Sequence, residues 1–92
     1  MDENTMLAAL KVDLGISTSV YDSRLKEYLR GAAENIKKEG ITLDLQNFGD
    51  SNLQIMYAAW MWRRRDSQDG MPRMLRWQMN NRLFSEKVKK DD

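Results

Sequence analysis

Residues 20–39 read VYDSRLKEYLRGAAENIKKE, and this stretch decides the fold class. Its apolar side chains recur every three to four residues, which is the period of an α-helix with one buried face. Ser19, followed three residues later by Asp22, is spaced as a capping box for the start of this helix, and Gly40 is suited to end it. The buried face is expected to contain Tyr21, Leu25, Tyr28, Leu29, Ala32, Ala33 and Ile36.

A shorter helix is predicted upstream, over residues 6–14. Thr5 is the expected N-cap, because its hydroxyl can accept an otherwise unpaired backbone N–H. Gly15 is placed to take the left-handed conformation that follows a helix.

On the outer face of the longer helix, over residues 20–39, Arg30 and Glu34 have the i, i+4 spacing of an ion pair.

Downstream, residues 41–50 alternate apolar and polar side chains, which is the period of a strand. No second strand-like segment exists to pair with them, so we expect an extended loop between two helices. Its apolar side chains should lie on the helices. They are Ile41, Leu43, Leu45 and Phe48.

The next helix is expected to begin at an Asp50 or Ser51 cap and to continue to about Arg65. It is apolar nearly all round, since Leu53, Met56, Tyr57 and Trp60 form one stripe and Ile55, Ala58, Ala59 and Trp62 form another. Such a helix is buried on more than one side. A domain this small offers few partners for the second side, so we expect that side to contact another subunit.

The last helix is predicted over residues 72–88, after a turn at residues 66–70, with Pro72 as its first residue. It too has two stripes: Leu75, Met79 and Leu83 on one side, and Trp77, Phe84 and Val88 on another. The sequence therefore predicts an all-α fold, a small bundle of about four helices with an extended loop between the second and third. Residues 1–92 should form one domain, with 1–4 and 89–92 frayed at its ends.

The composition argues against an enzyme or a metalloprotein. The chain contains no histidine and no cysteine, which removes the usual general base, the commonest metal ligand and any disulfide. Asp44 and Asp50 are the only catalytic candidates, by loop position alone, and we expect neither catalysis nor a metal or cofactor. No apolar run is long enough to span a bilayer, and the acidic start lacks the pattern of a signal peptide, which favours an intracellular protein.

Charge is divided unevenly along the chain. Residues 1–50 hold six basic and nine acidic side chains, a net −3, whereas residues 51–92 hold nine and five, a net +4. Three of the cations are consecutive, at residues 63–65. They fit the end of a helix, where cations offset the macrodipole and long stems cover tryptophans. They also fit a nucleic-acid surface or a protein interface, and three in a row suggest that at least one faces a partner outside the chain.

Three segments resemble the small head–tail connector (adaptor) proteins of tailed bacteriophages and prophages: residues 56–63, MYAAWMWR, residues 71–76, MPRMLR, and residues 80–84, NNRLF. The order of helices is similar as well. This resemblance implies an all-helical subunit of a structural ring between portal and tail. The acidic first half and basic second half of the chain suit head-to-tail contacts within such a ring. The hypothetical interface residues are Trp62, Arg63, Arg64, Arg65, Arg73, Arg76 and Trp77.

The same resemblance implies the partners and the place of action. They are other copies of the chain, the portal, the tail-side connector proteins and, non-specifically, the DNA in the channel, with no membrane. The protein would be found at the head–tail junction of the virion, and in the host cytoplasm during assembly. A small helical DNA-binding or regulatory module is the alternative, which Arg73, Arg76 and Arg82 interleaved with Trp77 would favour.

Overall fold

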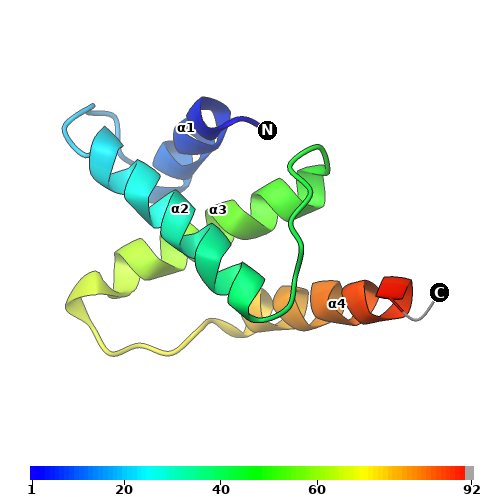
Figure 1. Ribbon diagram of the computed structural model, residues 1–92. Helices are drawn as coiled ribbons and strands as arrows, with labels where there is room; N and C mark the ends of the chain where they lie inside the picture. Colours follow the sequence, from blue (N-terminus) through cyan, green and yellow to red (C-terminus); the bar gives the residue numbers. More distant parts are fainter. Residues whose placement is uncertain (91–92) are drawn as a thin grey trace.

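Apolar residues at helical spacing produce four α-helices and one short 3-10 turn. A computed structural model describes the backbone of residues 1–90 and the side chains of residues 1–88. The elements are α1 (Glu3–Leu14), α2 (Asp22–Lys38), α3 (Phe48–Arg63), η1 (Arg64–Asp66) and α4 (Arg73–Lys90), with no strand among the described residues (Figure 1). The predicted all-α class, four-helix count and strand-free loop are confirmed.

Helix α3 is the centre of the bundle, and α1, α2 and α4 all pack against it. On the α2 side, the buried Gln54 side chain donates to the Leu29 carbonyl at 2.9 Å. Gly31 lets the Met61 side chain approach closely, because a Cβ added to this glycine would lie 3.3 Å from Met61 Cε. The core contains Met6, Leu7, Leu10, Leu25, Leu29, Ala32, Ile36, Ile41, Leu53, Ile55, Tyr57, Ala58, Ala59, Trp62, Leu75 and Met79. Most of both α3 stripes is therefore covered inside one chain, and the inference that its second side lacks partners is wrong.

Helix α1 begins three residues earlier than predicted. Asp2 is its N-cap, and its carboxylate accepts the Thr5 backbone N–H at 2.8 Å, so Thr5 is the donor rather than the cap. Residues 3 and 4, expected to fray, are helical. At the other end Gly15 takes a left-handed φ of 70°, and Ile16 N–H reaches the Lys11 carbonyl at 2.9 Å, which closes the helix as predicted.

Helix α2 begins at Asp22 with no side-chain cap, so the capping box expected at Ser19 does not form. Asp22 instead pairs with Lys11 of α1 at 2.8 Å. Arg30, expected to pair with Glu34, makes a two-point contact with Glu3, at 2.8 and 2.9 Å. These two contacts tie α1 to α2, and neither can be read from spacing along one helix.

Residues 41–47 form the expected extended connection, but only its first part packs inward. Ile41 is buried and Leu43 is half-buried, whereas Leu45 and Phe48 are exposed, contrary to expectation. Phe48 is already the first residue of α3, because Asn47 caps the helix by accepting the Asp50 N–H at 3.1 Å. The cap predicted at Asp50 or Ser51 therefore lies inside the helix.

The cap and the ion pair at the start of α1 make this end of the molecule sensitive to acid. The Thr5 backbone N–H holds the pKa of Asp2 below its ordinary value of 3.8, and Arg30 holds the pKa of Glu3 below its ordinary value of 4.5. Groups with a lowered folded-state pKa stabilise the fold above the unfolded value, and this contribution is lost as pH falls. We expect the first turn of α1 to loosen below about pH 4.5, seen as a shift of the Thr5 amide resonance. Asp2→Asn keeps a side chain that can cap the helix but has no ionisable group, so the part of the amide shift due to Asp2 should vanish. A Thr5 amide shift with the same pH dependence in this variant would show that Asp2 does not cause it.

No helix in the described part of the chain is long and apolar enough to cross a membrane. Backbone order continues to Lys90, so α4 extends two residues past the predicted Val88. Residues 89 and 90, expected to fray, are helical in their backbone, and residues 91–92 lie outside the described part of the chain.

Candidate interaction surface

Helix α4 is attached to the bundle by one narrow face. Leu75 and Met79 are buried against the core. Leu83 lies close to Gly40, because a Cβ added to this glycine would lie 3.3 Å from Leu83 Cδ1. Arg76 pairs with Glu39 at the end of α2, at 3.0 Å. The predicted inner stripe of this helix is confirmed.

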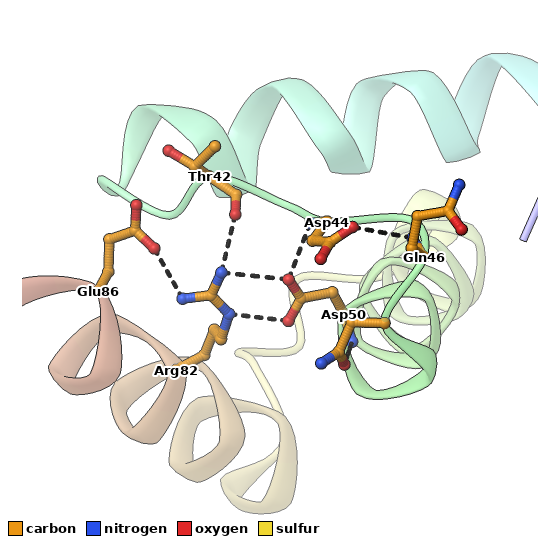
Figure 2. Close-up of polar contacts among 7 residues, drawn as sticks. Thr42, Asp44, Gln46, Asp50, Arg82 and Glu86 are labelled. Carbon is orange, nitrogen blue, oxygen red and sulfur yellow. Dashed lines mark hydrogen bonds and ion pairs between the residues drawn. The ribbon is translucent and has the colours of Figure 1, made fainter. Parts of the chain in front are cut away.

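Arg82 anchors the second half of α4 (Figure 2). Its guanidinium donates to both carboxylate oxygens of Asp50, at 2.7 and 3.1 Å, to Glu86 at 2.8 Å and to the Thr42 carbonyl at 2.7 Å. Asp50 also accepts the Asp44 backbone N–H at 2.9 Å. One side chain thus joins α4, the start of α3 and the loop that precedes α3.

This network assigns structural roles to residues that the sequence left as functional candidates. Hydrogen bonds from Arg82 to the Asp50 carboxylate raise the pKa of Arg82 above its ordinary value. The Arg82 side chain is 17% exposed and that of Asp50 is 7% exposed, and each is engaged by the other. Only the i, i+4 spacing of Arg82 and Glu86 was visible as a signal in the sequence.

The opposite face of α4 is apolar and exposed. Trp77 and Phe84, the two largest side chains on it, are 62% and 69% exposed. Together with Met74 and Val88 they follow the spacing i, i+3, i+10, i+14, which keeps them on one side of the helix. We call these four residues the α4 stripe. The prediction of a surplus apolar face on this helix is confirmed.

The two edges of the α4 stripe differ in charge. One edge carries the exposed cations Arg73 and Lys87, and the other carries the uncharged Asn81 and Ser85. The only acidic side chain among the described residues of α4, Glu86, is buried beside Arg82. The α4 stripe is therefore an exposed apolar strip with one basic edge and no exposed carboxylate.

Two surface grooves flank α4. A groove of ≈ 480 Å³ borders the uncharged edge, with Trp77 and Asn81 on one wall and Asp44 and Asn47 on the other. A second, of ≈ 390 Å³, lies between the end of α1, α3 and the start of α4. Its lining residues are Asp13, Met56, Ala59, Trp60, Arg63, Pro72, Met74 and Leu75.

The arginines at residues 63–65 each have a partner within the chain. Arg63 donates to the Asp13 carbonyl at 3.1 Å, which caps the end of α1, and the Arg64 guanidinium lies 4.4 Å from the centre of the Trp60 ring. Arg65 lies 3.8 Å from the Trp62 ring and donates to the Trp62 carbonyl. The three arginines thus reach three different sites within the chain, and all three remain exposed. The prediction that at least one of them faces a partner outside the chain stays a prediction.

Trp62, the first of the predicted interface residues, belongs to the core. It is 8% exposed, and its ring makes edge-on contacts with Tyr21 and Tyr28 at centroid distances of 5.4 and 5.5 Å. Of the residues expected at an interface, the structure thus places Arg73 and Trp77 on the outer face of α4. Trp62 lies in the core, and Arg63 and Arg76 make contacts between helices. Arg64 and Arg65 lie over tryptophans of α3, and all four arginines remain exposed.

No group of three or more acidic side chains in the described residues is arranged to hold a metal ion. No protein-family model matches this chain, no curated protein matches it in sequence, and no solved structure matches it.

Proposed function

We propose that this chain is a non-enzymatic assembly subunit of the head–tail connector of a tailed bacteriophage or prophage. The observation that carries the proposal is the α4 stripe. A small domain that leaves a tryptophan, a phenylalanine, a methionine and a valine exposed along one helix has an apolar strip suited to burial against another protein. Tryptophan, phenylalanine, methionine and arginine are also the residue types enriched in protein interfaces.

The resemblance to connector proteins supports the same function. Two of the three similar segments, residues 71–76 and 80–84, lie at the start and along the middle of α4. They include Met74 and Phe84 of the stripe and Arg82 of the anchor that holds the helix in place. The segments that prompted the resemblance thus include residues that present this surface.

The chemistry of the chain supports a structural role over a catalytic one. It has no histidine and no cysteine, and Asp50, a carboxylate considered for catalysis, is engaged by Arg82. A carboxylate held by a guanidinium at 2.7 Å is a poor general base, because its charge is already stabilised.

The proposed setting follows from the resemblance and from the charge distribution. Copies assemble head-to-tail into a ring, the acidic first half of one facing the basic second half of the next. The ring sits between the portal and the tail-side connector proteins, and DNA passes through it without sequence-specific contacts. The chain acts at the head–tail junction and is present in the host cytoplasm during assembly.

Light scattering over a range of protein concentrations, together with negative-stain images, tests this function. We expect the mass to rise with concentration and rings to be visible in the most concentrated samples. A monomer at every concentration, without rings, would overturn the proposal. Tight binding to duplex DNA that falls steeply with salt, in a protein that does not self-associate, would favour the DNA-binding module instead.

A further inference from the structure

The outer face of α1 carries small side chains and an acidic edge, whereas the α4 stripe carries large side chains and a basic edge. Thr5, Ala8 and Val12 share that face at i, i+3 and i+7, and all three are exposed, Val12 to 80%. Their side chains are small, so the face is a shallow surface rather than a ridge. Asp2 and Asp13, both exposed, lie along one edge of it.

The two faces complement each other in shape and in charge. Large side chains on α4, such as Trp77 and Phe84, meet small ones on α1, as ridges of one helix fill the grooves of another. The basic edge of the α4 stripe, with Arg73 and Lys87, meets the acidic edge of α1. By contrast, two α4 helices packed antiparallel on their stripes would bring the basic edges of both copies together.

Charge matching also fixes the relative direction of the two helices. Viewed from the N-terminus of a right-handed helix, successive residues advance clockwise. The cations of α4 lie anticlockwise of its stripe, whereas the carboxylates of α1 lie clockwise of its outer face. When two helices pack face to face, these edges fall on the same side only if the helices are parallel. At about 1.5 Å per residue, Arg73 and Lys87 are about 21 Å apart and Asp2 and Asp13 about 16 Å apart, a difference that long side chains can span.

The two faces lie on different helices, although Asp13 at the edge of the α1 face and Met74 of the α4 stripe border the same groove. Helices α1 and α4 have no Cα atoms within 8 Å of each other in the described residues, and Figure 1 shows α3 between them. One copy can therefore use both faces at once. A contact that joins two different surfaces propagates from copy to copy and closes into a ring when the rotation permits.

We propose that the α4 stripe of one copy binds the outer face of α1 of the next copy, with the two helices parallel. This contact rests on the proposed function, because it is the one through which the copies would assemble. It commits the stripe to a second copy of this chain rather than to a membrane surface or a different protein.

Two blocking variants test the contact. Phe84→Asp places a charge in the α4 stripe and leaves α1 intact, whereas Ala8→Arg fills the small face of α1 and leaves α4 intact. Each variant alone should lose self-association by roughly 30-fold or more, the effect of a central interface residue. An equimolar mixture of the two should give a one-to-one dimer and nothing larger, because each variant keeps one of the two faces. Circular dichroism checks that both variants keep their helices.

A charge exchange tests the parallel arrangement. Asp13→Lys should weaken self-association by about fivefold, as expected of a rim charge, and pairing it with Lys87→Glu should restore it. Glu34→Lys makes the same charge change on the exposed surface of α2 and should have no effect, which makes it the matched control.

Several outcomes separate this contact from the wider function. If the natural protein assembles but Ala8→Arg assembles equally well, or the mixture of blocked variants stays monomeric, the contact is wrong while a self-assembling function stands. If the natural protein is monomeric throughout, the proposed function fails together with the contact. Binding to vesicles of one part phosphatidylserine and three parts phosphatidylcholine that Phe84→Asp abolishes and Ala8→Arg does not would assign the α4 stripe to a membrane surface and overturn the contact.

Discussion

Replacement of Arg82 by methionine is expected to lower the free energy of unfolding by about 3 kcal/mol. The substitution keeps an unbranched apolar stem but leaves Asp50 and Glu86 without the guanidinium that pairs with both. Both carboxylates are largely removed from water, and removal of the cation from a buried ion pair is costly because the carboxylate loses its oppositely charged partner. Thermal unfolding should occur about 15 °C lower, from the usual relation between stability and melting temperature in a chain of this size.

Arg76→Met is the matched control, because Arg76 also joins α4 to the bundle through one carboxylate, Glu39. Its side chain is 45% exposed, so the pair is screened by water and should contribute less than about 1 kcal/mol. Neutralising both acids as well, in Arg82→Met with Asp50→Asn and Glu86→Gln, should recover much of the loss. Equal effects of the two arginine substitutions would mean that Arg82 is not the main anchor of α4.

The same substitution separates stability from assembly. Arg82 is not one of the four residues of the α4 stripe, although it lines the same groove as Trp77. The anchor therefore orients the stripe without being part of it. Loosening α4 should therefore reduce self-association only through the orientation of the helix. Arg82→Lys keeps the charge but loses the two-point contact with Asp50. The stability of this variant should fall between those of the natural protein and Arg82→Met.

Periodicity predicted the helices because it depends on residues close in sequence. The left-handed Gly15 and four of the buried positions predicted for α2, Leu25, Leu29, Ala32 and Ile36, follow from spacing and local conformational preference and are observed. Tyr21, predicted to be buried, is 45% exposed. The outer stripe of α4 was visible for the same reason, since its two faces are separated by about half a turn of one helix. These features need no knowledge of how the helices pack.

The errors arise where contacts join distant residues. Arg30 is paired with Glu3, twenty-seven residues away, and Arg82 with Asp50, thirty-two residues away, and no local pattern reveals either. The second side of α3 was assigned to another subunit because the sequence does not show that α3 lies at the centre of the bundle, with α1, α2 and α4 around it. The contact of Arg63 with the end of α1 was not predicted for the same reason, since Asp13 is fifty residues away in sequence.

Trp62→Ala and Trp77→Ala are expected to have opposite effects. Trp62 is a core residue held between Tyr21 and Tyr28, so its removal should cost about 3–5 kcal/mol of stability through lost burial and the cavity left behind. Trp77 is 62% exposed on the α4 stripe, so its removal should change stability by less than about 1 kcal/mol. Self-association should depend on the other tryptophan. It should weaken by roughly 30-fold in Trp77→Ala, as expected when a tryptophan buried in an interface is removed.

Chemical denaturation of each variant, followed by light scattering under conditions where both remain folded, separates the two roles. The sequence alone favoured Trp62 as the interface residue, because it lies on the second apolar side of α3, whereas the geometry reverses that order. A Trp77→Ala protein that is as unstable as Trp62→Ala would place the outer face of α4 inside the monomer core. One that keeps full stability and full self-association would show that the α4 stripe does not mediate assembly, and the proposed contact with α1 would fall with it.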